Sequence, residues 1–189
     1  MMIKKINFFL YSLLLVISTG AIAENKHYLD ENREVSFIIP FSQNHHYVHT
    51  DIVINATREQ VWEVLTDFNS MPIWSSSLLG IEGDIENGAQ VIVNFKIRGN
   101  VFQVPHTLIY YENLGFGWAE EIGNLPGITD NHRYIVGRSD GSKTLFIQSD
   151  EFKGINSERT TADIAEGVKQ VYMTFNRELK QEVERRFSQ

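Results

Sequence analysis

Apolar residues occupy every second position in several short segments in the middle of the chain. In the clearest case, residues 90–97, the apolar positions are Val91, Val93, Phe95 and Ile97. This two-residue period is typical of a strand with one buried face. Turns rich in Gly and Asn separate such segments, which predicts strands at residues 47–54, 79–85, 90–97, 101–111, 117–122, 132–138 and 143–152. Short turns between consecutive strands indicate an antiparallel sheet.

Two other segments have the three- and four-residue spacing of a helix. Thr57 and Gln60 have the form of a capping box, in which each side chain accepts a hydrogen bond from the other residue's backbone N–H. Apolar positions follow over residues 61–68, and Pro72 ends or restarts the helix. Residues 161–187 repeat apolar positions over about 25 residues, which predicts one long C-terminal helix. These patterns predict an α+β domain: a strand, two short helices, six further strands and a long helix.

One glycine interrupts the apolar half of the predicted C-terminal helix. Gly167 costs roughly 1 kcal/mol there relative to alanine. Two interpretations stay open, namely tight packing of another segment against the helix, or space that is left for a ligand.

The first 23 residues have the pattern of a secretory signal. Lys4 and Lys5 precede an apolar run over residues 6–17, and Ala21 and Ala23 supply small residues at the −3 and −1 positions of a cleavage site. The run is about a dozen residues long, which is short of the ~20 needed to span a bilayer. We therefore expect cleavage near Ala23, a periplasmic or secreted location, and no stable membrane anchor in the mature form.

The rest of the chain is expected to form one domain with a short extension before it. Residues 24–44 are mostly polar and predict an N-terminal extension, loosely attached, with at most one edge strand. Pro40 disfavours a central strand there, because proline cannot donate to a sheet ladder. Residues 45–189 form the predicted domain.

Charge and cysteine content exclude several functions. The chain has a formal net charge of −7, and removal of residues 1–23 would make it −9, since that segment contains two lysines and no acidic residue. A negative protein is a poor match for a nucleic-acid backbone. The chain has no cysteine, so it has no disulfide, no thiolate nucleophile and no cysteine-ligated metal.

Three histidines lie close together at the start of the first predicted strand. They are His45, His46 and His49. Neighbouring residues of a strand point to opposite faces, which separates His45 from His46, and no pattern of carboxylates accompanies them. We therefore expect no metal site and no cofactor.

Several segments are similar to one superfamily of proteins. They are residues 54–57 before 61–68, then Pro72, Trp74, Gly83, Gly88, residues 114–118 and 126–128 leading to His132, and finally residues 144–148, 150–154 and 172–179. On these segments the chain resembles the SRPBCC superfamily, with its START and birch-pollen-allergen-like helix-grip fold, within the polyketide cyclase/dehydrase-type bacterial branch. The resemblance covers about residues 46–187.

The resemblance implies a specific architecture and a range of functions. A curved antiparallel sheet of about seven strands would wrap around the long C-terminal helix, with an elongated and mainly apolar cavity between them. Members of the superfamily bind lipids, sterols, polyketides or plant hormones, and some are cyclases or hydrolases. Function must therefore be argued from the site, because the fold alone does not specify it.

Candidate cavity residues come from strand faces that combine aromatic side chains with single polar ones. His106 and His132 are acid–base candidates, since imidazole titrates near neutral pH, although a purely structural hydrogen-bonded role stays open for both. Asp150 is unusual on an apolar strand face and needs a partner, for which Arg133 or Arg98 is expected. The complete set of candidates is Trp62, Phe102, His106, Phe116, Trp118, His132, Tyr134, Phe146, Gln148, Asp150, Tyr172 and Phe175.

Three functions are compatible with these observations. The preferred one is an exported binding protein for a hydrophobic small molecule such as a lipid or a polyketide. The second is a cyclase, dehydratase or hydrolase, which requires His106, His132, Asp150 or Glu120 to converge in the cavity. The third is a protein-interaction module with a filled core. The sequence shows no Ser-His-Asp order, no Gly-rich phosphate loop and no zinc-binding helix motif, so no catalytic residue is assigned.

Overall fold

The computed structural model describes residues 29–187. The predicted signal segment, residues 1–23, therefore lies outside the described residues. Within residues 29–187, no helix has both the length and the apolar character needed to cross a membrane.

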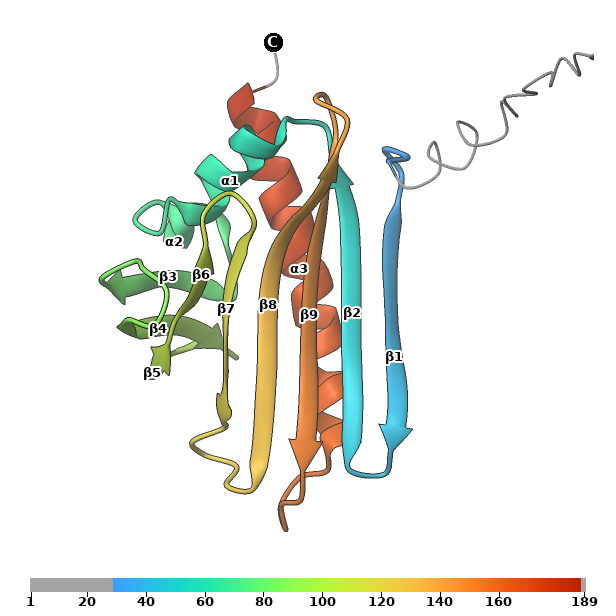
Figure 1. Ribbon diagram of the computed structural model, residues 1–189, viewed down its shortest axis with the longest axis vertical. Coiled ribbons are helices and arrows are strands. Elements are labelled where there is room, and N and C mark those ends of the chain that lie inside the picture. Colours follow the sequence, from blue (N-terminus) through green and yellow to red (C-terminus); the bar gives the residue numbers. More distant parts are fainter. Residues whose placement is uncertain (1–28, 188–189) are drawn as a thin grey trace, which may run out of the picture.

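The largest layer of the fold is a six-stranded antiparallel sheet (Figure 1). Each strand pairs antiparallel with its neighbours, so hydrogen bonds link segments that are far apart in the chain. In spatial order the strands are β1 (Glu34–Ser42), β2 (His45–Ile54), β9 (Thr144–Gly154), β8 (Ile128–Ser139), β7 (Gly115–Glu121) and β6 (Ile109–Tyr111).

A separate three-stranded antiparallel sheet contains the strands β3 (Leu78–Gly83), β4 (Gln90–Ile97) and β5 (Asn100–Thr107). The prediction of one continuous strand over residues 101–111 is wrong, because Leu108 divides it into β5 and β6. The backbone of Leu108 turns back to the loop before β4: its N–H donates to the carbonyl of Ala89 (2.8 Å), and its carbonyl accepts from the N–H of Gly88 (2.7 Å). The chain therefore leaves one sheet at this residue and enters the other.

The predicted edge strand in residues 24–44 is confirmed as β1. It pairs with β2 along most of its length, and Pro40 lies in this edge strand as expected. Ile38 packs against a group of buried side chains that also includes Val48 and Phe152. The prediction of loose attachment is therefore wrong for residues 34–42, which are an integral part of the sheet.

The three helices lie on one side of the six-stranded sheet. The long helix α3 (Thr161–Phe187) runs behind the sheet in Figure 1 and packs mainly on β2 and β9. The short helices α1 (Arg58–Thr66) and α2 (Met71–Trp74) follow β2. The predicted capping box of α1 is confirmed, since both of its hydrogen bonds are present. The fold is thus the helix-grip arrangement that the sequence predicts, with its strands divided between two sheets.

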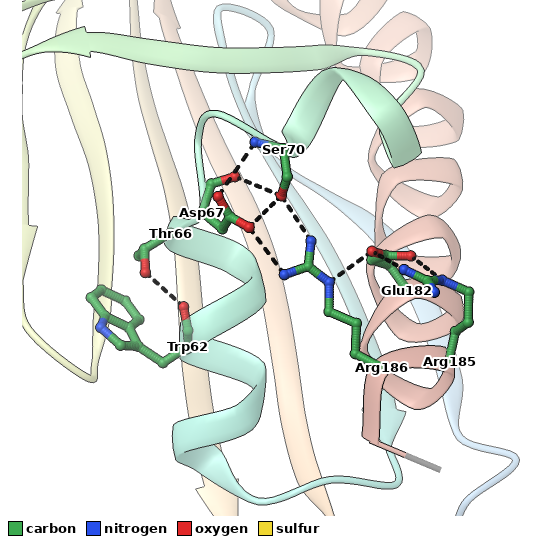
Figure 2. A network of polar contacts seen from close by, with 7 residues as sticks. All are labelled: Trp62, Thr66, Asp67, Ser70, Glu182, Arg185 and Arg186. Carbon is green, nitrogen blue, oxygen red and sulfur yellow. Dashed lines mark hydrogen bonds and ion pairs between the residues drawn. The ribbon is translucent and has the colours of Figure 1, made fainter.

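A polar network joins the end of α1 to the end of α3 (Figure 2). Arg186 donates to Asp67 (3.0 Å), to the Ser70 hydroxyl (2.7 Å) and to Glu182 (2.7 Å). Glu182 also accepts two hydrogen bonds from Arg185. The bonds from Arg185 and then Arg186 lower the pKa of Glu182 to about 2. Arg186 is the member that bridges the two helices, because only its guanidinium contacts both.

We expect Arg186→Ala to lower the free energy of unfolding by about 1–2 kcal/mol, because it leaves Asp67, Ser70 and Glu182 without their shared donor. Arg185→Ala is the matched control. That side chain is 69% exposed and bonds only within α3, so its loss should cost much less than the loss of Arg186. Urea unfolding of both variants measures the difference. Equal losses would show that the bridge between α1 and α3 contributes nothing beyond a pair on the surface of one helix.

Candidate functional site

The inner face of the six-stranded sheet, which faces α3, carries stacked aromatic rings. Phe116 lies opposite Tyr134, and Trp118 lies opposite His132, across β7 and β8. The ring of His132 stacks on Tyr134 and on Tyr172 of α3, each at a centroid distance of 4.6 Å. We call the following residues the interior cluster: His106, Phe116, Trp118, His132, Tyr134, Gln148, Asp150, Tyr172 and Phe175.

Asp150 is the most deeply buried carboxyl group of this cluster, with 1% of its surface exposed. Its Oδ2 accepts a hydrogen bond from the Tyr172 hydroxyl (2.6 Å), and its Oδ1 accepts one from the backbone N–H of Asn131 (3.1 Å). Burial raises the pKa of Asp150 well above its ordinary value, and the negative charge of Asp130 raises it further. Burial therefore disfavours the charged form of this group.

The prediction that Arg133 or Arg98 pairs with Asp150 is wrong. Arg133 donates to the backbone carbonyls of Trp118 (2.6 Å) and His132 (2.9 Å), because alternation along β8 directs it to the outer face of the sheet. Arg98 lies at the exposed turn between β4 and β5. The actual partner is Tyr172, whose helix is brought over the sheet only by the tertiary fold.

His132 is buried and neutral. Burial lowers its pKa to about 3, and the nearby positive charges of His106 and Arg133 act in the same direction. The Nε2 atom of His132 is 2.8 Å from the amide nitrogen of Gln148 and accepts its N–H. This contact assigns the imidazole proton to Nδ1. Nδ1 faces Asp150 Oδ2 at 3.9 Å, which is too long for a direct hydrogen bond.

A second group of titratable side chains lies at the edge of the interior cluster. His106 stacks on Trp118 at 4.5 Å, and its Nδ1 is 3.7 Å from Glu120 Oε2. Burial lowers the pKa of His106, and Glu120 opposes that shift. Asp130 accepts the Trp118 indole N–H (3.2 Å), and burial raises the pKa of Asp130 to about 6. Asp130 is not among the residues predicted from the sequence, although its two-residue spacing from His132 on the same strand could have indicated it.

The other predicted site residues divide into buried and exposed ones. Phe146 is buried beside the cluster, and its ring centroid lies 6.3 Å from that of Phe175. Trp62 of α1 packs on Tyr110 at the end of the core that α1 closes. The structure does not bring Phe102 together with the others. It shares a face of the three-stranded sheet with His106, but it lies beyond the buried part of that face and is 46% exposed.

The elongated cavity that the resemblance implies is closed in this structure. A pocket of about 210 Å³ lies on the outer face of the sheet and is lined by Ile109, Tyr111, Leu114, Gly115, Phe116, Arg133, Tyr134 and Ile135. Another, of about 350 Å³, lies between the start of β1 and α3 and is lined by Glu31, Asn32, Arg33, Glu34, Ile52, Arg177, Lys180, Gln181 and Glu184. Neither of these two pockets is the elongated apolar cavity, because the residues of the interior cluster are buried against one another and fill the centre of the space beneath α3.

Several buried polar atoms among the described residues have no hydrogen-bond partner. Three of them belong to residues of the interior: Nδ1 of His106, the side-chain oxygen of Gln148 and the side-chain oxygen of Asn176 on α3. A buried polar atom without a partner costs about 1–3 kcal/mol, so each such atom in a native protein requires an explanation. A bound molecule that supplies the missing partner is one such explanation.

The three clustered histidines do not converge. His45 contacts Glu151 (2.6 Å), His46 contacts the Thr161 hydroxyl (2.8 Å), and His49 contacts Asp51 (2.8 Å). Within residues 29–187, no group of three or more His, Cys, Asp or Glu side chains has the arrangement needed to hold a metal ion.

Gly167 of α3 is not explained by tight packing. A Cβ atom added there would meet no atom within 4 Å, so no segment of the described chain needs the missing side chain. Gly167 is exposed on the helix surface, so the open space beside it is solvent and the structure supports neither interpretation.

The sheet, the helix order and the long C-terminal helix define a helix-grip protein of the SRPBCC/START superfamily. More specifically, the chain belongs to the family described as polyketide cyclase / dehydrase and lipid transport, whose model matches residues 45–184. No curated protein sequence matches the chain.

Solved structures share the fold at low sequence identity. A START superfamily protein from Mycobacterium smegmatis is 16% identical, with a TM-score of 0.59 over 74% of this chain and 97% of that one. The Zhui aromatase/cyclase from Streptomyces sp. R1128 is 15% identical, with a TM-score of 0.57 over 75% and 95%. The protein Ara h 8.0201 is 14% identical, with a TM-score of 0.54 over 74% and 97%. At these identities the similarity establishes the fold alone.

Proposed function

We propose that the chain is an exported protein that binds a hydrophobic small molecule, such as a lipid or a polyketide, between the inner face of the sheet and α3. The observation that carries this proposal is the set of unpartnered polar atoms within a buried aromatic surface, above all the side-chain oxygen of Gln148. The family description, which includes lipid transport, supports the same class of ligand. Export rests on the signal pattern of residues 1–23.

The chemistry of the interior selects among hydrophobic ligands. Burial disfavours the charged forms of His132 and Asp150, so the site is a poor environment for a buried ion. The free oxygen of Gln148 accepts a hydrogen bond, which fits a hydroxyl or N–H group on the ligand. The proposed ligand is therefore an uncharged molecule with an apolar body and one hydrogen-bond donor.

Binding requires the closed interior to open. The three-stranded sheet shares no strand pairing with the six-stranded sheet, and α3 packs mainly on β2 and β9. Movement of β3, β4 and β5 away from α3 would therefore separate side chains of the interior without breaking a sheet ladder. His106 on β5 and Trp118 on β7, which stack on each other, are the rings that such a movement would part first.

Native mass spectrometry of the gently purified chain tests the proposal. We expect a bound apolar molecule, or uptake of an uncharged hydroxylated lipid. Gln148→Leu should lower its occupancy roughly tenfold, because the ligand donor loses its acceptor. Gln103→Leu is the matched control, since Gln103 is exposed on β5 and bonds only to Asn94. A chain that never carries or takes up an apolar molecule, or a Gln148→Leu variant that binds like the control, would count against the proposal.

A second function, an interaction module without a ligand, is favoured by the closed interior itself. The same mass spectra distinguish it, because such a module would show no bound molecule under any condition. An enzymatic function has separate support: His106 converges with Glu120, and His132 converges with Asp150, as acid–base catalysis would require. Conversion of a bound polyketide, detected as a change in the ligand's mass, would favour that alternative.

A further inference from the structure

The turn between β4 and β5 presents exposed apolar side chains at the end of a narrow hairpin. Arg98 and Gly99 have φ values of 50° and 84°, as in the two-residue turns that connect antiparallel strands. Around this turn Ile97, Val101 and Phe102 are 55%, 59% and 46% exposed. We call residues 96–102 the hairpin tip.

The hairpin tip is positively charged in a negative protein. Lys96 and Arg98 lie within it and are exposed, and neither forms an ion pair with another residue of the described chain. No Asp or Glu occurs from residue 87 to residue 111, whereas the whole chain carries a net charge of −7. The tip therefore combines apolar and basic side chains with Asn100 and contains no acidic residue.

The apolar face of the hairpin is continuous with the interior cluster. Phe95 pairs with Phe102, and Val91 pairs with His106, so these side chains share one face of the three-stranded sheet. The ring centroid of Phe95 lies 6.3 Å from that of His106 and 5.7 Å from that of Trp118. Burial decreases along this face, from Val91 through the partly buried Phe95 to the exposed Phe102. An apolar surface thus runs from the interior to the tip.

We propose that the hairpin tip docks on an anionic lipid surface, with Ile97, Val101 and Phe102 entering the headgroup–acyl boundary and Lys96 and Arg98 contacting lipid phosphates. Exposed apolar side chains beside basic ones are the pattern by which elements at a membrane interface bind. Three apolar side chains on one turn are far fewer than the 20–30 residues that each partner contributes to a stable protein interface. A lipid surface has no such requirement. This docking is a property of the tip and does not depend on whether the interior holds a ligand.

The absence of cysteine makes a local test straightforward. Val101→Cys in the full chain accepts one polarity-sensitive fluorophore, and Phe102→Cys provides a second reporter. Leu114→Cys is the matched control, because Leu114 is also exposed but lies in the turn between β6 and β7, beside α1 (Figure 1). Each labelled chain is mixed with vesicles of phosphatidylcholine, with or without about one quarter phosphatidylglycerol, and with a lipid that carries a quencher on its acyl chain.

We expect a blue-shifted and roughly threefold brighter emission at position 101 with anionic vesicles, quenched by the acyl-chain quencher. Position 114 should not respond, and Lys96→Gln with Arg98→Gln should weaken the response at 101 roughly tenfold. If the protein bound vesicles through residues 6–17 instead, the fluorophore at position 101 would stay in water and its emission would not shift, as at the control position 114. The proposal would be overturned if the fluorophores at positions 101 and 102 did not respond to anionic vesicles, or if the fluorophore at position 114 responded equally. It would also be overturned if the emission at position 101 shifted when unlabelled protein was added to labelled protein without vesicles. The last outcome would assign the tip to a protein contact.

Discussion

Gly117→Ala is expected to lower the free energy of unfolding by on the order of 3 kcal/mol, as overpacking against an immobile backbone does. A Cβ atom at Gly117 would lie 2.0 Å from the carbonyl oxygen of His132 on the neighbouring strand. That oxygen belongs to the backbone of β8, so it cannot move aside without shifting the strand. The close approach of β7 to β8 at this glycine also sets the position of Trp118 against His132, which makes the interior cluster sensitive to the same change.

Gly123→Ala is the control for this prediction. Gly123 lies in the loop between β7 and β8, and a Cβ atom there would meet no atom within 4 Å. Both substitutions restrict the unfolded chain equally, so urea unfolding of the pair isolates the packing effect. We also expect Gly117→Ala, and not Gly123→Ala, to alter the near-ultraviolet circular dichroism of the aromatic side chains. Unfolding free energies of the two variants within about 0.5 kcal/mol of each other would refute the close approach of the strands.

Lowering the pH from 7 to 4 is expected to cost the folded chain on the order of 3 kcal/mol through His132 alone. Burial lowers the pKa of His132 from its ordinary value of 6.5 to about 3. Between these values the unfolded chain binds a proton that the folded chain does not. The stability that the neutral imidazole contributes is therefore complete above pH 6.5 and is lost progressively as the pH falls toward 3.

Other groups also change stability in overlapping pH ranges. Burial raises the pKa of Asp130 to about 6, so its contribution is present in acid and is lost as the pH rises through about 6. The pKa of Glu182 is lowered to about 2, so its contribution is present above its ordinary range and is also lost in acid. The pKa of Asp150 is raised, so its contribution is greatest in acid and is lost as the pH rises above its ordinary value. Asp150 therefore offsets part of the loss from His132.

Because other groups also titrate, the test compares variants at each pH. His132→Gln keeps a side-chain amide for Gln148 and removes the titrating ring, so its unfolding free energy should fall by about 3 kcal/mol less than that of the parent chain between pH 7 and pH 4. His45→Gln, on the outer face beside Glu151, serves as the histidine control. Parallel pH profiles for the parent chain and His132→Gln would show that His132 is not held neutral by burial.

Local features of the fold followed from the sequence because their causes are local. The capping box at Thr57 and Gln60 involves residues three positions apart, and the predicted bounds of the C-terminal helix, 161–187, are those of α3. The exact strand over residues 90–97 follows from alternation alone. The break at Leu108 did not, because it results from hydrogen bonds to Ala89 and Gly88 in a different part of the chain.

The candidate site was predicted in part. Alternation placed Trp118, His132, Gln148 and Asp150 on a common face, and the structure brings them together. Asp150 was recognised as unusual, but its partner Tyr172 lies on α3, 22 residues further along the chain. Phe102 lies on the predicted face of its strand, but it is exposed and not buried. Alternation along a strand shows to which face a side chain points, but it does not show how far the layer that covers this face extends.

The sequence by itself therefore determined the fold class, the order of the elements and which residues of each strand share a face. These depend on periodicity and on contacts between near neighbours in the chain. Only the tertiary structure decided that the interior is closed, that burial disfavours the charged forms of His132 and Asp150, and that Phe102 is exposed with Ile97 and Val101 at a hairpin tip. Each of these depends on burial, which is set by how distant strands and α3 pack against one another.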